Sequence, residues 1–239
     1  MNLPISTIRS LIRTKHIFYV LLMMSAGCSQ TTSLLGRTVS DAWDNSNDVF
    51  VSQADVDALP YASMYAKVGD GARAFVVLAF ADKITHRTQN GLVSKTELSW
   101  LSADKKMLVT ESGRLTRTHG LREGELLNVN TASKDPISDG LLLKTTPNHW
   151  TRYLDWQPGN HFAVRVDSTF ENRGSTLISV NDKPVNTIHI VEHVRVKSLD
   201  LQYSNDFWLS PDSGDVLASR QHLAPGLPEI KMTILKPFG

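Results

Sequence analysis

Two histidines and one glutamate lie within five residues of one another late in the sequence. His189, Glu192 and His193 match the His-x-x-Glu-His pattern of inverted zinc proteases. That chemistry requires a helix, in which positions i and i+4 converge on one metal. The segment 187–196 is instead rich in β-branched residues, which predicts a strand that separates the two histidines by roughly 13 Å. We therefore expect a half-exposed strand and no metal site.

Other motifs of catalysis and cofactor binding are weak or missing. Gly69 and Gly71 satisfy a loose dinucleotide fingerprint, but they precede an apolar segment instead of joining a strand to a helix, so we expect a tight turn. The sequence contains neither a Gly-x-Ser-x-Gly elbow nor a P-loop. Glu97, Glu111 and Glu123 are scattered along the chain. We predict no catalytic residues and no cofactor, and we do not expect an enzyme.

Aromatic residues gather in one short stretch. Trp150, Tyr153 and Trp156 lie beside Arg152 and Asp155. Rings with polar neighbours can form a platform on which sugars stack, so these three aromatic residues are candidate contacts for a polysaccharide or a protein partner. Packing in the core is the commoner use of such large side chains, and it is the interpretation that we favour.

A second candidate surface is basic. Arg114, Arg117 and His119 fall on one expected hairpin, where they would form an edge able to meet an acidic polymer. A solvated edge that is protected by its charges is the commoner explanation of such a pattern. Arg114 and Arg117 are retained as candidate contacts.

The elements that must position these residues are mainly strands, because turn signals recur at about the 8–12-residue spacing of antiparallel folds. We predict an all-β, mainly antiparallel fold: a curved sheet, half-barrel or sandwich with one or two short helices. The continuously apolar segment 74–81 predicts a strand covered on both faces. Turns are expected at 111–113, 172–174 and 181–184. We interpret residues 123–150 as a long crossover between two β halves of the domain.

Composition limits the classes of protein to consider. The 239 residues are 41% hydrophobic and 21% charged, which is typical of a globular chain. A net charge of +1 argues against a general nucleic-acid binder. The sole cysteine, Cys28, excludes a disulfide framework within the chain and a zinc site built on several thiolates.

The amino-terminal residues have the pattern of an export signal. Arg9, Arg13 and Lys15 precede an apolar run of eight residues, 17–24, that is too short to span a bilayer. Ser25-Ala26-Gly27-Cys28 resembles the bacterial lipobox, in which the signal is removed and the cysteine is acylated. The alternative is a plain signal peptide followed by an incidental thiol. We predict a signal peptide over 1–27, lipidation of Cys28, a tether over 28–47 and a single β-rich periplasmic domain over 48–239.

Several short motifs resemble one known family. Leu59-Pro-Tyr-Ala-Ser-Met-Tyr65, Trp100-Leu-Ser-Ala-Asp104 and the ordered block that ends at Leu121 are similar to the YjbF/GfcB lipoproteins of exopolysaccharide and group-four capsule gene clusters. The resemblance implies an outer-membrane lipoprotein that faces the periplasm, has β structure and is needed to produce or export a surface polysaccharide. Ser29 after Cys28 looks like the outer-membrane address of enterobacterial lipoproteins. The resemblance implies no catalytic residues.

These observations lead to one functional hypothesis and two alternatives. The chain is expected to be a non-enzymatic accessory factor, anchored in outer-membrane lipid through acylated Cys28, that acts with polysaccharide or with export-machinery proteins encoded nearby. The hairpin 207–216 also looks like that of half-barrel lipoprotein chaperones, so a carrier of lipid or lipoproteins is the first alternative. A polysaccharide-modifying enzyme is the second, and it would need two convergent carboxylates or a histidine and a carboxylate.

Overall fold

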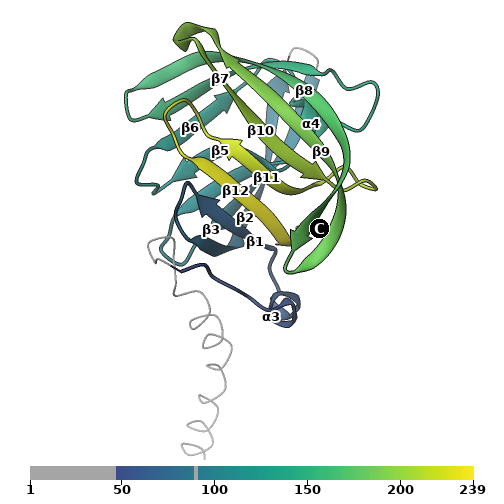
Figure 1. Cartoon of the computed structure of the whole chain (residues 1–239). Coiled ribbons are helices and arrows are strands. Elements are labelled where there is room, and N and C mark those ends of the chain that lie inside the picture. Colours follow the sequence, from purple (N-terminus) through teal and green to yellow (C-terminus); the bar gives the residue numbers. More distant parts are fainter. Residues whose placement is uncertain (1–46, 89–90) are drawn as a thin grey trace, which may run out of the picture. The chain divides into compact units, whose positions relative to one another are not determined.

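The structure is a computed structural model that describes residues 47–88 and 91–239. The expected signal peptide, Cys28 and nearly all of the expected tether lie outside the described residues. The sheet domain is drawn in Figure 1, coloured along the sequence.

One twelve-stranded antiparallel sheet forms the domain and curls into a nearly closed barrel (Figure 1). Its strand order is β5-β4-β3-β2-β1-β12-β11-β10-β9-β8-β7-β6, so every pair of neighbours except β1 and β12 is consecutive in sequence. The all-β prediction is confirmed. The strands are β1 (Ser63–Val68), β2 (Arg73–Thr88), β3 (Gly91–Leu101), β4 (Met107–Glu111), β5 (Arg114–His119), β6 (Glu125–Asn130), β7 (His149–Gln157), β8 (His161–Val180), β9 (Lys183–Val196), β10 (Leu201–Leu209), β11 (Val216–His222) and β12 (Glu229–Lys236), and the short helices are α3 (Gln53–Ala58), α4 (Pro136–Asp139) and the 3-10 turn η1 (Lys197–Leu199).

Alternating side chains fill the interior of the barrel. Along β7, Trp150, Arg152, Leu154 and Trp156 are buried while the residues between them are more exposed. This period of two is what a strand with one covered face produces. Leu154 and Trp156 join the inward residues of other strands in one packed cluster, which includes Met64, Ala66, Trp100, Leu108, Leu126, Val166, Val194 and Ile230.

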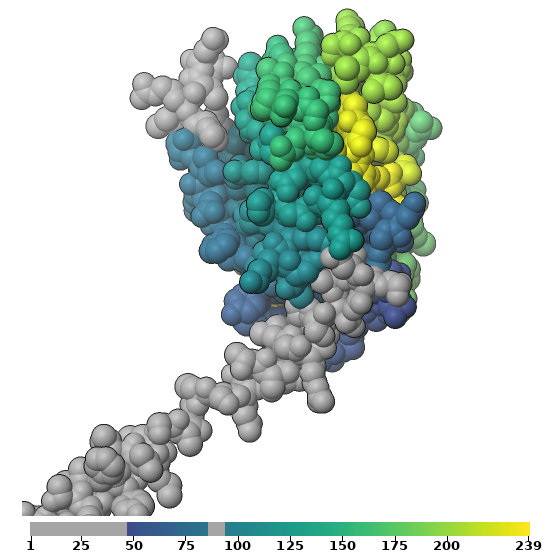
Figure 2. Space-filling view, turned by 90° about the vertical axis from the view of Figure 1, so that its left-hand side faces the viewer, coloured from purple at the N-terminus to yellow at the C-terminus, as the bar shows by residue number. Residues whose placement is uncertain are grey.

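The two ends of the sheet meet at a seam between β5 and β6, which lie side by side (teal in Figure 2). Side chains join the two strands there. The backbone N–H of Leu126 donates to Thr118 Oγ1 at 3.0 Å, and the N–H of Gly120 donates to the Glu125 carboxylate. The seam therefore satisfies edge groups that would otherwise be unpaired.

A segment ahead of β1 covers part of the outer face of the sheet. Val49 N–H donates to the Arg73 carbonyl at 2.8 Å, and Val51 N–H donates to the Tyr65 hydroxyl at 2.8 Å. This covering agrees with the prediction that both faces of 74–81 are buried, but only as far as Val76, because Val77 and Leu78 are half-buried. The prediction is wrong for the second half, where Phe80 is 64% exposed, because the covering segment does not extend over it.

Two of the expected turns are present and one is not. The hairpin at 111–113 is confirmed, and Asn181 and Asp182 form the β8–β9 turn with positive φ. The turn expected at 172–174 is wrong: β8 continues through it with a bulge between Asn172 and Gly174, where Gly174 has φ +85°. A bulge also uses glycine in the left-handed region, so its sequence signal resembles that of a turn.

Residues 123–150 are more ordered than a plain crossover. They contain β6 and α4, and the same sheet includes the strands on both sides of them. Because neighbouring strands are antiparallel, the connections alternate between the two ends of the barrel. The end where β1 begins, here called the entry end, therefore also carries the β4–β5 and β10–β11 turns, α4 and the residues after β12.

Candidate functional site

A groove opens at the entry end of the barrel. The β4–β5 turn, α4, the β10–β11 turn and the two residues Pro237 and Phe238 surround it. Its volume is about 540 Å³, and a neighbouring hollow of about 360 Å³ shares Leu98, Ser112, Ser138 and Phe238 with it. Sites for small ligands usually measure roughly 300–1,000 Å³. The groove is therefore large enough to hold part of a ligand at the surface of the domain.

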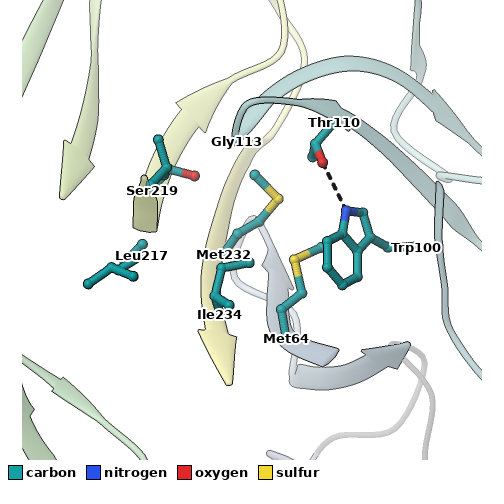
Figure 3. A pocket seen from close by; sticks show the side chains of 10 residues that line it. Met64, Trp100, Thr110, Gly113, Leu217, Ser219, Met232 and Ile234 are labelled. Atoms are coloured by element: carbon teal, nitrogen blue, oxygen red, sulfur yellow. Dashed lines mark hydrogen bonds between the residues drawn. The ribbon is translucent and has the colours of Figure 1, made fainter. Parts of the chain in front are cut away.

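The floor of the groove is apolar and closed. A space of only about 20 Å³ continues inward between Met64, Met232 and Trp100 (Figure 3). Trp100 Nε1 donates to Thr110 Oγ1 at 2.9 Å, which satisfies the indole N–H and holds the ring against the floor. Such a space admits about one water molecule. This space is too small to admit an acyl chain.

Polar groups line the upper part of the groove and the hollow beside it. Lys95 pairs with Glu111 at 3.0 Å, and Lys134 pairs with Asp139 at 2.8 Å. Asp215 is exposed at the β10–β11 turn and lines the groove, and its carboxylate has no ion pair or hydrogen bond within residues 47–88 and 91–239. The free charge of the groove is therefore negative.

The helix α4 forms one wall of the groove and is fixed by its first residues. Asp135 is the N-cap: its side chain accepts a hydrogen bond from the N–H of Ile137 at 3.0 Å, and Pro136 occupies the first helical turn. Gly140, with φ +94°, ends the helix in the left-handed region. These are standard start and stop signals. Asp135 also accepts a hydrogen bond from Arg114, which ties the helix to the barrel interior.

Beneath the groove lies a buried ion cluster centred on Glu192. Arg114 Nη1 donates to one carboxylate oxygen at 2.9 Å, and Arg152 Nη1 donates to the other at 2.7 Å. Asn205 Nδ2 adds a third donor at 2.8 Å. Glu192 has no exposed surface, and each arginine is 3% exposed. A charge buried to this degree is tolerated because it is paired and hydrogen-bonded on all sides.

The electrostatics of this buried ion cluster keep Glu192 and Arg114 charged. Burial by itself would raise the pKa of Glu192, but the charges of Arg114 and Arg152 outweigh it and hold that pKa well below its ordinary value. Burial would likewise lower the pKa of Arg114, whereas Asp135 and Glu192 raise it. The carboxylate of Glu192 is therefore ionised throughout the neutral range.

Trp150 completes the cluster as an aromatic partner. Its ring lies 4.7 Å from the guanidinium carbon of Arg114 and 4.8 Å from that of Arg152. Cation–π contacts of this kind gain strength where water is excluded. The structure thus brings together two of the candidate contacts, Trp150 and Arg114, but as buried neighbours inside the barrel.

The remaining candidates are dispersed. Trp156 is 1% exposed and stacks on His161, whereas Tyr153 points to the opposite face of β7 and is 39% exposed. A shared sugar-stacking platform is therefore wrong: Tyr153 is three residues from each tryptophan, and strand positions an odd number of residues apart face opposite sides. Core packing, the favoured interpretation, holds for Trp150 and Trp156.

The expected basic edge of the hairpin is wrong for Arg114. Arg114 points inward instead of into solvent, because its charge is matched by Asp135 and Glu192. Arg117 remains at the surface, where its side chain is 49% exposed and pairs with Glu97 at 2.8 Å. No continuous basic surface results from these two arginines.

The predicted strand around the two histidines is confirmed as β9. His189 Nε2 lies 2.7 Å from Asp206 and stacks on Trp208, while His193 Nε2 lies 2.9 Å from Glu171. Within the described part of the chain, no three histidine, cysteine or carboxylate side chains gather as a metal site would need.

Comparisons with known proteins identify the family of this chain. Residues 36–235 match the family model described as group 4 capsule polysaccharide lipoprotein gfcB, YjbF. The chain belongs to this family. The uncharacterized lipoprotein GfcB of Escherichia coli (strain K12) is 32% identical over 222 residues, 92% of this chain and 97% of that protein. The uncharacterized lipoprotein YjbF of the same strain is 26% identical over 223 residues, 92% of this chain and 96% of that protein.

A solved structure supports the fold of the family. The hypothetical lipoprotein YmcC from Escherichia coli (K12) superimposes with a TM-score of 0.67 at 32% identity, over 89% of this chain and 99% of that one. None of the helices described in this YjbF family member is long and apolar enough to cross a membrane.

Glu192, Arg152, Asn205 and Asp135 were missed as site residues, although the sequence carries a signal for the first two. Glu192 occupies an inward position in the alternating series Ile188, Ile190, Val194 and Val196. Arg152 does the same among Trp150, Leu154 and Trp156. A charged residue on an otherwise apolar strand face indicates a buried, paired charge. Asp135, in contrast, carries only the signal of a helix N-cap before proline.

Proposed function

We propose that this chain is an outer-membrane lipoprotein, acylated at Cys28 and facing the periplasm, that acts as a non-enzymatic accessory factor in the production, export or assembly of an extracellular or capsular polysaccharide. The observation that carries this proposal is the family match over residues 36–235, which begins eight residues after the expected lipidation site. Ser29 supports the outer-membrane destination.

The contacts of the enclosed ionisable groups support an accessory role over catalysis. Both oxygens of Glu192 already accept hydrogen bonds from arginine or asparagine. Asp206 is held between His189 and Arg220 on the outer face of the sheet. A general acid or base must be free to exchange a proton with a substrate, and neither carboxylate has that freedom.

The filled interior favours the accessory role over a lipid carrier. Carriers of acyl chains need an apolar cavity of matching depth, whereas the space beneath the groove floor measures about 20 Å³. The groove at the entry end is open and mixed in polarity, which suits a contact with a polar chain or a protein.

The test of the proposal is deletion of the gene in its native host. Polysaccharide on the cell surface and precursor in the cell are measured separately, by antibody or lectin binding to intact cells and by extraction. We expect surface polymer to be lost while precursor synthesis continues, and a plasmid copy of the wild-type gene to restore it. Unchanged surface polymer in the deletion strain would overturn the proposal.

Membrane fractionation tests the proposed location in the outer membrane. Mature protein should sediment with outer-membrane markers in a sucrose gradient. A Cys28→Ser variant, which has no thiol to acylate, should leave that fraction. Recovery of wild-type protein in the inner membrane would contradict the proposed location.

A further inference from the structure

We propose that the groove at the entry end binds a segment of polysaccharide that is uncharged or bears amino groups. This inference rests on the proposed function and specifies the ligand and the surface that contacts it. The groove residues that carry the argument are Leu217, Ile234 and Phe238 on the apolar side and Ser112, Ser138 and Asp215 on the polar side.

The shape of the groove suits a chain that passes across it. The hollow of about 360 Å³ and the groove of about 540 Å³ are contiguous through Leu98, Ser112, Ser138 and Phe238. Together they form a track along the entry end instead of a deep pocket. A polymer can lie in such a track without threading an end into it, whereas the closed floor at Trp100 and Met232 stops an inserted acyl chain.

The chemistry of the lining matches the two faces of a sugar. Pyranose rings carry apolar C–H faces and a periphery of hydroxyl groups. Leu217 and Phe238 offer apolar surface, and Phe238 is 52% exposed, so its ring is accessible. The hydroxyls of Ser112, Ser138 and Ser213 offer donors and acceptors beside them. Small-ligand sites combine an apolar lining with a few polar groups in this way.

Charge selects the kind of sugar. The two lysines nearby are already neutralised, Lys95 by Glu111 and Lys134 by Asp139. The Asp215 carboxylate is left without a counter-charge among the described residues. An acidic polymer would be repelled by that carboxylate, whereas the hydroxyls of a neutral segment can donate hydrogen bonds to it and an amino sugar would add an ion pair.

The walls are held rigidly, which lowers the entropic cost of binding. Asp135 joins α4 to Arg114, and Gly113 packs directly against Val216 across the barrel. The groove is therefore formed before a ligand arrives, and side chains that line it can be changed without touching the buried ion cluster.

Binding can be measured with the mature lipoprotein in mild detergent. The probes are fragments of the host's own surface polysaccharide prepared by partial acid hydrolysis, with chitosan oligosaccharide as an amine-bearing probe and oligogalacturonate as an acidic probe. Saturation-transfer NMR detects contact and calorimetry gives affinity. We expect saturable binding of the polysaccharide fragments and of chitosan oligosaccharide, and weaker binding of oligogalacturonate. Preferential binding of oligogalacturonate would overturn the charge assignment.

Two matched pairs of variants locate the site. Leu217→Trp fills the groove, and we expect it to weaken binding of the fragments about tenfold or more. Leu177→Trp makes the same change on the 69% exposed Leu177, outside the groove, and should leave affinity unchanged. Asp215→Asn should weaken chitosan oligosaccharide selectively, whereas Asp212→Asn, in the same turn but outside the groove, should not. Equal changes in affinity for the two variants of either pair would contradict the proposed position of the site.

The outcomes separate this inference from the proposed function. If deletion of the gene abolishes surface polymer but no fragment binds the purified protein, the saccharide site is wrong and the accessory role stands. If a fluorescent fatty acid binds and Leu217→Trp abolishes that binding, the groove is a lipid site and the inference is overturned. If fragments bind while the deletion strain keeps its surface polymer, the proposed function fails.

Discussion

Arg114, at the start of β5, donates a hydrogen bond of 2.9 Å to Glu192 on β9, 78 residues further along the chain. The same guanidinium also binds Asp135, the N-cap of α4. One buried side chain therefore joins the β4–β5 turn, the helix that forms a wall of the groove, and the middle of the sheet. The architecture of the entry end depends on this contact.

Replacing Glu192 should be among the most destabilising changes to the barrel. Glu192→Gln keeps the shape but leaves Arg114 and Arg152 without a full counter-charge, which typically costs about 3–5 kcal/mol. Guanidinium unfolding followed by tryptophan fluorescence measures the free energy of unfolding. Glu171→Gln changes an exposed glutamate on β8 that pairs only with exposed side chains, so it should change the free energy of unfolding far less. A loss for Glu192→Gln no larger than for Glu171→Gln would refute the importance of the buried pairs.

The free energy of unfolding should depend on pH through the Glu192 carboxylate. The pKa of Glu192 lies below its ordinary value in the folded state, so its contribution is fully present above the unfolded pKa of about 4.3 and is lost as pH falls below it. Wild-type protein should therefore lose more free energy of unfolding between about pH 5 and pH 3 than Glu192→Gln does. Parallel pH profiles of the two proteins would show that the carboxylate is not linked to folding.

The attachment of α4 can be tested at Asp135. Asp135→Ala removes the helix cap and one partner of Arg114, so we expect a loss of about 3 kcal/mol or more and faster amide exchange over 136–140. Asp139→Ala removes only a surface pair with Lys134 and should cost about 0.5 kcal/mol or less. Unaltered exchange in Asp135→Ala would mean that other contacts hold the helix.

Gly113 provides a test of the close approach between the β4–β5 turn and β11. A Cβ at this position would lie 2.4 Å from Val216 Cβ, and φ is +84°. Gly174 has nearly the same φ, +85°, with nothing within 4 Å. Gly174→Ala should cost about 1–2 kcal/mol from backbone strain, and Gly113→Ala about 2–5 kcal/mol because a clash is added. Equal losses of stability would show that the turn moves away freely.

The seam between β5 and β6 gives a further prediction. Thr118→Val keeps the shape of the side chain but removes the oxygen that accepts the Leu126 N–H, so a buried donor is left unpaired. Such a loss costs about 1–3 kcal/mol. Thr116→Val, on the same strand, removes a partly buried hydroxyl and should cost less. The comparison is made by thermal unfolding, and equal melting temperatures for the two variants would contradict a structural role for the seam.

The sequence allowed the type of fold and most of the strands to be predicted because both depend on local patterns. Alternation marked β9, and glycine marked the hairpin at 111–113. The error at 172–174 arose because a bulge and a turn both place glycine at positive φ. Strand β6 was missed within 123–150, since prolines and glycines nearby obscured a strand of six residues.

The candidate site was only partly accessible to sequence reasoning because its contacts are distant along the chain. Trp150 and Arg114 were selected for their chemistry, yet the direction of each side chain depends on the register of β7 and on the partners that Glu192 and Asp135 supply. The groove gathers residues from the turns at 112–113 and 210–215, from α4 and from the end of the chain. Only the closing of the sheet brings these segments together.

The claim that this domain is held at the membrane by lipid is tested most directly by the mass of the mature amino terminus. Protein extracted from membranes of its native host would be digested and its first peptide measured by mass spectrometry. The account predicts a peptide that begins at Cys28 and carries a thioether-linked diacylglyceryl group and an amide-linked acyl chain. A chain that begins at Met1, or a peptide with an unmodified Cys28 thiol, would contradict it.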